Sequence, residues 1–263
     1  MNHLLRGLAP VSDLAWEELD GEARERLTPA LAARTLLDFN GPLGWEHSAY
    51  NLGRTIRLTD SPVEGVSARR RRVLPLAELR ADFSISREEL QDRARGADDI
   101  DMDALDRAAH QIATAETRAV FHGWDDTFVG IVDATPHQQA LPVDAADYPA
   151  RIAAALALLL QSGIPGPYAL ATGTQEYRRV TGAADDGYPI GRHIEGIIDG
   201  GIVWVPGLTG AVVMSTKGGD FIFECGQDLS IGYHSHDADE VQLYLEESFS
   251  FHVATPEAAV ALQ

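Results

Sequence analysis

The sequence predicts a mixed α+β fold, and three observations carry this prediction. Apolar residues recur at steps of three and four from Leu105 to Ala119, which is the spacing of an amphipathic helix. Apolar and polar residues alternate from Val241 to Glu246, as in a strand with one buried face. Residues 45–76 show turn residues and branched side chains without a helical stripe, so we expect a long extended arm there.

Two further helices follow from their boundary signals. Ser12 precedes apolar residues at helical spacing and is a typical N-cap, while Thr28 as a cap and Pro29 as a first helical residue predict a shorter helical continuation. Residues 148–161 are nearly all apolar on one side and are closed by Gly163, so this helix must be buried. From there to the C-terminus we expect mostly strands, interrupted by two helices and a loop rich in glycine and aspartate.

Composition excludes several kinds of partner. The chain has 263 residues, of which 45% are hydrophobic, so it can bury a sizeable core. Forty acidic and twenty-one basic residues give a net charge of -19, which repels phosphate backbones and anionic lipid surfaces. We therefore expect no nucleic acid and no membrane partner. No stretch reads as a signal peptide or reaches membrane-spanning length, so we expect a cytoplasmic protein.

The sequence contains no recognised catalytic signature. It has no Gly-x-Gly-x-x-Gly, phosphate loop, Gly-x-Ser-x-Gly or His-Glu-x-x-His. It also lacks the Glu-x-x-His spacing of helical di-iron sites, so the chain itself does not resemble a ferroxidase. We expect no catalytic residue, no cofactor and no enzyme activity.

The stretch DLSIGYHSHD, residues 228–237, raises the question of a metal site. His234 and His236 with a nearby aspartate could ligate zinc or iron, but a solvated turn is the favoured interpretation in so acidic a chain. A nucleophilic pair of Cys225 with His234 lacks any local signature. We predict neither a metal site nor a nucleophile here, and expect Cys225 to be a small buried hydrophobe.

A run of four arginines, Arg69 to Arg72, lies in the expected arm. It could contact nucleic acid, or it could pair with carboxylates of a neighbouring subunit, and the acidic composition favours the second alternative. An arm of about thirty residues without its own core is explained most simply if it lies on another chain. The sequence therefore indicates assembly.

Several segments, taken together, resemble the first family of encapsulin shell proteins, a group once named linocin-type bacteriocins. The segments are LAPVSDLAWEEL, GRTIRLTD, ADFSISREELQDRARG, GPYAL, DDGYPIGRHI, GGDF and, most specifically, GQDLSIGYHSHDADEVQLYLEESFSF. The resemblance runs in order over the whole chain. It implies the major capsid fold of tailed phages, of the Hong Kong 97 type.

The resemblance also implies a division of the chain into domains. Residues 1–44 would form part of a peripheral domain with the N-terminal helix, and residues 45–76 would form its extended loop. Residues 77–135 would continue the peripheral domain with a long spine helix. An axial domain would follow over 136–224, and residues 225–263 would return to the peripheral domain as C-terminal strands.

Such a shell protein would assemble with itself into an icosahedral cage, with sixty copies in the smallest case. The cage would enclose a cargo enzyme through the cargo's C-terminal targeting peptide. Family cargos include dye-decolourising peroxidases and ferritin-like iron oxidases, which implies oxidative-stress defence or iron storage. A (pro)phage major capsid protein is the alternative with the same fold. A secreted protease or bacteriocin would need export and catalytic signatures that the sequence lacks.

The resemblance assigns the cargo peptide to a groove on the inner wall. Apolar pockets would take its leucine or isoleucine side chains, and Arg34 with Asp38 would bond its backbone. On this basis Leu36→Ala is expected to leave shells intact but empty. The groove residues implied by the resemblance are Leu27, Leu31, Arg34, Leu36, Asp38, Asp228, Leu229, Ile231 and Tyr233.

The loop TGAADDGYPIG resembles the loop that surrounds the five-fold pore of the family. The pore residues it implies are Asp185, Asp186, Gly187 and Tyr188, whose carboxylates would attract cations. Some members stack a flavin on a tryptophan in the segment aligned with ISREEL. Arg87 holds that place in this chain, so we do not expect flavin binding.

Overall fold

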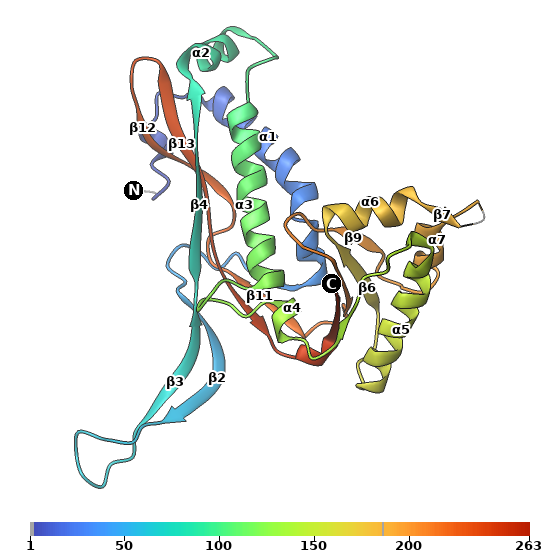
Figure 1. Ribbon diagram of the computed structural model, residues 1–263. Coiled ribbons are helices and arrows are strands. Elements are labelled where there is room, and N and C mark those ends of the chain that lie inside the picture. Colours follow the sequence, from blue (N-terminus) through green and yellow to red (C-terminus); the bar gives the residue numbers. More distant parts are fainter. Residues whose placement is uncertain (1–2, 186) are drawn as a thin grey trace.

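The computed structural model describes residues 3–185 and 187–263 (Figure 1). Its first sheet is built around a long C-terminal strand, β13, which pairs with β11 and β12 along one edge and with β4 along the other. The short strand β1 extends the sheet by pairing in parallel with β11. The strands of this sheet are β1 (Asp38–Asn40), β4 (Ala77–Ser86), β11 (Phe221–Cys225), β12 (Ser230–His236) and β13 (Glu240–Val253).

The alternation predicted for the last long strand is confirmed. Val241, Leu243 and Leu245 are fully buried, because they face the helices that cover this sheet. On the other face, the ring of Tyr244 lies under the guanidinium of Arg80, 3.7 Å from its carbon to the ring centre. One face of β13 therefore builds core and the other is closed by polar side chains.

Two helices, α1 and α3, lie side by side against the first sheet (Figure 1). The predicted spine helix is present as α3, and its apolar stripe packs on β4 and α1. Ser12 caps α1 as predicted, since its hydroxyl accepts a 3.2 Å hydrogen bond from the N–H of Ala15. The helices of this layer are α1 (Asp13–Ala30), α2 (Arg87–Arg95), α3 (Asp103–His122) and α4 (Ile131–Ala134).

A shorter helical continuation is present, but the prediction that it begins at Thr28 and Pro29 is wrong. α1 continues through Pro29 to Ala30 and then tightens into a 3-10 helix, η2 (Ala32–Leu36). The hydroxyl of Thr28 donates to the carbonyl of Arg24 one turn back, so it does not cap a new helix. A proline in the last turn removes only one helical N–H bond, and the chain tolerates that loss here.

A second sheet forms a separate layer, and helices α5, α6 and α7 pack around it (Figure 1). Its strand order is β5-β14-β10-β6-β9, and every residue of β6, β10 and β14 is buried. The elements of this layer are β5 (Gln138–Gln139), α5 (Tyr148–Gln161), β6 (Tyr168–Thr172), α6 (Thr174–Gly182), α7 (Ile190–Glu195), β9 (Ile202–Trp204), β10 (Ala211–Ser215) and β14 (Ala259–Leu262).

The C-terminal segment contributes to both sheets. β13 is the central strand of the first sheet, whereas β14 pairs antiparallel with β10 and belongs to the second. β11 pairs with β13 in the first sheet. The sequence alone does not reveal these memberships, because strand pairing between distant segments is not encoded in local sequence pattern.

The extended arm is a two-stranded hairpin that projects from the body (Figure 1). Strands β2 (Ala49–Arg57) and β3 (Arg69–Pro75) pair only with each other, and most of their residues are exposed while none is buried. This confirms the prediction of an arm without its own core. A smaller hairpin joins β7 (Ala184–Asp185) to β8 (Tyr188–Pro189). Short 3-10 turns complete the fold at η1 (Arg6–Leu8), η3 (Ala145–Asp147) and η4 (Pro256–Ala258).

Candidate functional site

A groove of about 350 Å³ runs between α1 and the start of β12. Its first wall is one face of α1 and the turn that follows, because residues three and four apart on a helix share a face. Its second wall is the segment leading into β12, with Leu245 of β13 behind it. The lining residues are Asp20, Ala23, Arg24, Leu27, Thr28, Leu31, Arg34, Asp228, Leu229, Ser230, Ile231 and Leu245.

The structure brings together six of the nine groove residues that the resemblance implied, although they come from two segments about 200 residues apart in the chain. The six are Leu27, Leu31, Arg34, Asp228, Leu229 and Ile231. Sequence reasoning missed the groove residues one and two turns before Leu27, such as Asp20 and Arg24. Helical spacing counted backwards from Leu27 would have found them.

Three of the implied residues do not line this groove. Leu36 is buried in the core beside the second sheet, and Asp38 accepts a 2.8 Å hydrogen bond from the N–H of Gly219. Both flank a different, small hollow near Phe221. Tyr233 is buried, and its hydroxyl lies 2.6 Å from Nδ1 of His236. The turn of η2 rotates residues 36 and 38 away from the face that carries Leu31.

The centre of the groove is apolar and preformed. Leu27, Ile231 and Leu245 are buried members of one hydrophobic cluster, and they form its floor. Leu31 and Leu229 pack against that cluster but remain half-exposed, one on each wall. Such a floor between two partly exposed leucines accepts an aliphatic side chain of a partner, which gains from leaving water.

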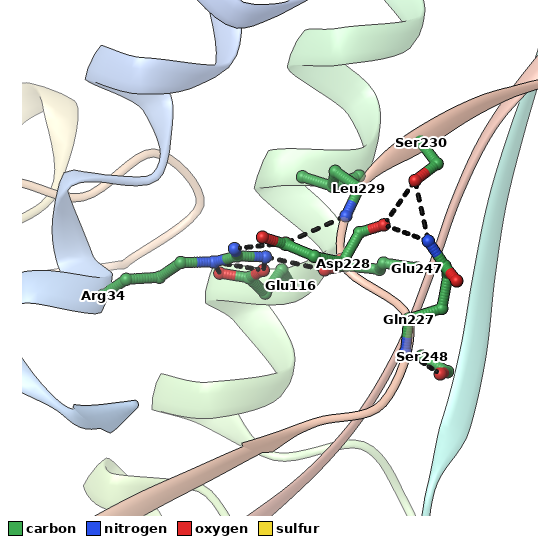
Figure 2. A network of polar contacts seen from close by, with 8 residues as sticks. All are labelled: Arg34, Glu116, Gln227, Asp228, Leu229, Ser230, Glu247 and Ser248. Carbon is green, nitrogen blue, oxygen red and sulfur yellow. Dashed lines mark hydrogen bonds and ion pairs between the residues drawn. The ribbon is translucent and has the colours of Figure 1, made fainter. Parts of the chain in front are cut away.

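One end of the groove is closed by a charge network centred on Arg34 (Figure 2). The guanidinium reaches across to the spine helix, where its Nε lies 2.9 Å from a carboxylate oxygen of Glu116. It also donates to Asp228 and to Glu247, each at 2.8 Å. Glu116 and Glu247 have 1% and 0% of their side chains exposed, so two of the three carboxylates are buried.

The network is held by opposing electrostatic effects. Burial by itself lowers the pKa of Arg34, but the hydrogen bond and charge of Glu116 outweigh it and raise the pKa above its ordinary value, so Arg34 stays charged. Burial, followed by the charge of Glu116, raises the pKa of Glu247 well above its usual range, and Arg34 offsets this only in part. A proton on Glu247 reduces the number of negative charges facing one guanidinium.

This occupation of Arg34 changes the role assigned from sequence. Its donors are already directed at three carboxylates of the same chain, so it orients the groove wall instead of waiting for a partner's backbone. Asp228 also fixes the neighbouring backbone, because its carboxylate accepts a 2.9 Å hydrogen bond from the N–H of Leu229. The half-exposed leucine on the second wall is thereby fixed in position.

The turn before β12 is also tied down by its own side chains (Figure 2). The amide of Gln227 donates to the hydroxyl of Ser230 at 2.8 Å, and its backbone N–H donates to the hydroxyl of Ser248 at 2.9 Å. Ser230 donates in turn to the carbonyl of Asp228 at 2.8 Å. The wall is therefore ordered before any partner arrives, which lowers the entropic cost of binding.

Gly232 in β12 is explained by contacts within the chain. A Cβ built at this position would lie 2.1 Å from the ring of Tyr244, on the face of the sheet opposite the groove. The ring that covers Gly232 is the one stacked under Arg80. The glycine is thus required by packing within the chain.

His234 and His236, the two histidines of DLSIGYHSHD, lie at the end of β12 and are exposed. Nδ1 of His234 lies 3.0 Å from the hydroxyl of Ser235, while His236 contacts Tyr233. Over residues 3–185 and 187–263, no cluster of three or more histidine, cysteine or carboxylate side chains is arranged to hold a metal ion. Cys225 is buried, and burial raises the pKa of its thiol to about 12, so it carries no thiolate at neutral pH.

Three of the implied pore residues, Asp185, Gly187 and Tyr188, lie in the small hairpin of β7 and β8. Asp185 and Tyr188 pair across the hairpin and are exposed, and Gly187 has a φ of +83° that suits glycine in a tight turn. Tyr188 stacks on His193 with 4.5 Å between ring centres. Asp186 lies outside the described residues.

Arg87 begins α2, and its guanidinium donates a 2.9 Å hydrogen bond to the carbonyl of Asp237. It is thus tied to the turn after β12. Among the described residues, no helix combines the length and apolar composition needed to cross a membrane.

Comparison with known sequences identifies relatives along the whole chain. A sequence profile of the family described as "Encapsulating protein for peroxidase" matches residues 1–250. A type 1 encapsulin shell protein of Rhodospirillum rubrum is 46% identical over 100% of this chain and 97% of its own length. That of Rhodococcus erythropolis is 40% identical over 100% of both chains. These relatives are named as shell components, which agrees with the expectation that the chain is not an enzyme.

Solved structures share the architecture at low sequence identity. The virus-like particle from Pyrococcus furiosus has a TM-score of 0.68 at 16% identity, over 94% of this chain and 99% of that chain. The capsid of the native GTA particle has a TM-score of 0.53 at 16% identity, over 89% of each chain. The likeness establishes the capsid fold. Together with the profile match and the identities of 40–46% to full-length relatives, it shows that the chain belongs to the type 1 encapsulin shell proteins.

Proposed function

We propose that this chain is the protomer of a closed shell, and that it retains a cargo protein by binding the cargo's C-terminal peptide in the groove between α1 and β12. The observation that carries this proposal is the preformed apolar floor of Leu27, Ile231 and Leu245, flanked by two half-exposed leucines. An extended peptide with leucine or isoleucine side chains matches such a floor. The full-length identity to named shell proteins supports the same role.

Assembly is supported by the charge of the arm. It carries six arginines, Arg54, Arg57 and Arg69 to Arg72, and in the described part of the chain none of them forms an ion pair. Arg54 lies directly opposite Arg72, and Arg57 opposite Arg69. Like charges opposite each other destabilise a hairpin, so the arm needs carboxylates from outside it. A neighbouring copy of this acidic chain supplies them.

The proposed cargo is an oxidative enzyme, either a peroxidase or a ferritin-like iron oxidase. The family description names a peroxidase, which supports the first alternative. The exposed hairpin of Asp185 and Tyr188 is proposed to line an opening through which small cations reach the interior. Location in the cytoplasm completes this proposal.

The experiment co-expresses the shell with a fluorescent protein that bears the C-terminal tail of a candidate cargo encoded beside this gene. Size-exclusion chromatography and electron microscopy are expected to show hollow particles that contain fluorescence. The paired variant Leu31→Ser and Leu229→Ser is expected to form the same particles with at least tenfold less fluorescence, because both half-exposed leucines are lost.

A matched control exchanges two exposed leucines outside the groove, Leu14→Ser and Leu160→Ser, and is expected to load normally. A dispersed monomer in solution contradicts the shell role. Full loading of the groove variant, in particles that are intact, contradicts the groove as the cargo site. The two parts of the proposal are therefore tested separately.

A further inference from the structure

The charge network at the end of the groove holds three carboxyl groups against one guanidinium (Figure 2). Glu116 on α3 and Glu247 on β13 have 1% and 0% of their side chains exposed. The third carboxylate, Asp228, has 43% of its side chain exposed and lines the groove. If all three were ionised, Arg34 would balance one negative charge, and an uncompensated charge would lie out of reach of water.

A proton on Glu247 removes this imbalance. One nitrogen of Arg34, Nη2, donates to Glu116 and also to Oε2 of Glu247 at 2.8 Å, so the two buried carboxyl groups meet at one atom. The other oxygen of Glu247, Oε1, is buried and accepts no hydrogen bond from the described residues. An ionised oxygen without a donor is costly in such a place, whereas a protonated carboxyl can donate to the neighbouring Glu116.

The groups that face Glu247 keep their own charge as pH changes around neutrality. Arg34 stays charged, and the thiol of Cys225 stays neutral because burial raises its pKa to about 12. Across the sheet, β4 places the apolar Leu79 opposite Glu247. The pKa of Glu247 is raised by burial and by the charge of Glu116, so Glu247 is the member that changes charge. The charged and titratable groups around it are Arg34 from η2, Glu116 from α3, Asp228 from the turn before β12 and Cys225 from β11.

Loss of the proton from Glu247 acts on Asp228. Of the three carboxylates, only Asp228 is exposed enough to turn toward water, because the other two are enclosed. A second buried negative charge draws the guanidinium of Arg34 inward and repels Asp228 from its Nη1. Asp228 also accepts the N–H of Leu229, so its departure releases the leucine that forms the second wall of the groove.

We propose that occupation of the groove is linked to a proton beneath it: the groove binds its occupant tightly while Glu247 is protonated, and loosens when Glu247 ionises and Asp228 turns away from Arg34. The proton leaves to solvent, and no covalent bond other than its own O–H bond breaks. Affinity is therefore full at acid pH and falls as pH rises through the pKa of Glu247. This inference rests on the proposed function and adds a regulation of the same groove by pH.

The test titrates assembled shells into a rhodamine-labelled synthetic peptide with the C-terminal tail of the candidate cargo, from about pH 5 to about pH 9, and follows fluorescence anisotropy. Light scattering verifies intact shells at each pH. Affinity for native shells is expected to fall at least about tenfold, whereas Glu247→Gln, which is neutral throughout, should change less than about twofold. A flat native profile, or a parallel fall in Glu247→Gln, overturns the proposal.

Two further variants test the route from Glu247 to the groove wall. Glu25→Gln, at an exposed position of α1 outside the groove, is the matched control and should keep the native profile. Asp228→Asn keeps the titrating group but removes the charge that it repels, so affinity should vary less than about twofold over the same range. A native-like profile in Asp228→Asn, or a flat profile in the control, overturns the proposal.

Proton uptake supplies a second readout on the native protein. Calorimetry of peptide binding in buffers of different ionisation enthalpy counts the protons exchanged. Native shells are expected to take up protons in the range where affinity falls, and Glu247→Gln shells to take up none. Absence of uptake by native shells overturns the linkage, and equal affinity at every pH does so while leaving the groove function standing. If the peptide binds at no pH, the proposed groove function fails, and this inference fails with it.

Discussion

The groove and the arm are built in opposite ways. The groove is preformed within one chain, with a floor that belongs to a buried hydrophobic cluster and an end fixed by Arg34 and its carboxylates. The arm has two strands, no core and six arginines without partners among the described residues. The difference teaches that the groove is formed by the folded protomer alone, whereas a two-stranded arm without a core needs stabilising contacts from outside itself.

This contrast predicts where substitutions act. Changes beneath the groove should unfold the protomer, changes on the groove walls should affect cargo alone, and changes in the arm should affect assembly alone. The following predictions proceed from the largest expected effect on protomer stability to the smallest.

Replacing the cation beneath the groove is expected to have the largest effect. Arg34→Met leaves Glu116 and Glu247 buried without their counter-charge, and we expect a loss of about 3–5 kcal/mol in the free energy of unfolding. Urea unfolding at fixed protein concentration measures it. The combined variant Arg34→Met, Glu116→Leu and Glu247→Leu should recover most of the loss. Equal instability of both variants contradicts the role of unpaired charge.

Leu36 is expected to behave as a core residue, against the sequence-based expectation of intact but empty shells. Leu36→Ala removes a side chain that is 5% exposed, and we expect about 2–5 kcal/mol of destabilisation. Leu31→Ala, on the half-exposed wall, is the matched comparison and should mainly lower cargo loading. Stable, empty Leu36→Ala shells with an unchanged unfolding midpoint would restore the original assignment.

The buried carboxyl of Glu247 is expected to make protomer stability depend on pH. Its folded pKa is raised above the ordinary value of 4.5, so the folded chain holds a proton that the unfolded chain has released. Stability therefore falls as pH rises from about 4.5 toward the folded pKa, by up to about 1.4 kcal/mol per pH unit. Glu247→Gln should not show this loss. Its free energy of unfolding relative to that of the native protein should therefore increase as pH rises across this range.

Parallel urea titrations between pH 4.5 and neutrality measure the difference between the two proteins. Glu25→Gln, at an exposed position on α1, is the matched control and should follow the native profile. A constant offset between Glu247→Gln and the native protein at every pH would show that Glu247 does not take up the proton.

The smallest effect on the protomer is expected in the arm. Arg70→Glu with Arg72→Glu changes two exposed side chains, so protomer unfolding should shift by less than about 0.5 kcal/mol. The same variant should lose closed particles in electron microscopy, because reversed charges repel the acidic neighbour. Arg95→Glu, an exposed site on α2, should still assemble. Intact shells formed by the arm variant would contradict an electrostatic role for the arm.

Local pattern was sufficient for many elements of the fold. The stripe from Leu105 to Ala119 predicted the spine helix, the alternation after Glu240 predicted β13, and the absence of either pattern over 45–76 predicted the arm. Pattern failed at Pro29, where a helix continued past a start signal, and at β14, whose four apolar residues do not reveal the sheet they join. In both places the observed structure depends on contacts with distant segments.

The candidate site was also predictable from the sequence only in part. Six groove residues followed from the resemblance, and the backward helical spacing from Leu27 would have supplied more. The partners of Arg34 could not be read from sequence, because Glu116 and Glu247 lie 82 and 213 residues away. With forty carboxylates in the chain, only their positions in space select these two.

The sequence by itself determined the acidic composition, the periods that form the main helices and strands, and the motifs that the family shares. The tertiary structure alone decided that Arg34 is occupied within the chain, and that Leu36, Asp38 and Tyr233 lie outside the groove. The physical reason is that periodicity records which face of an element is buried, whereas hydrogen-bond partners depend on packing between segments far apart in the chain.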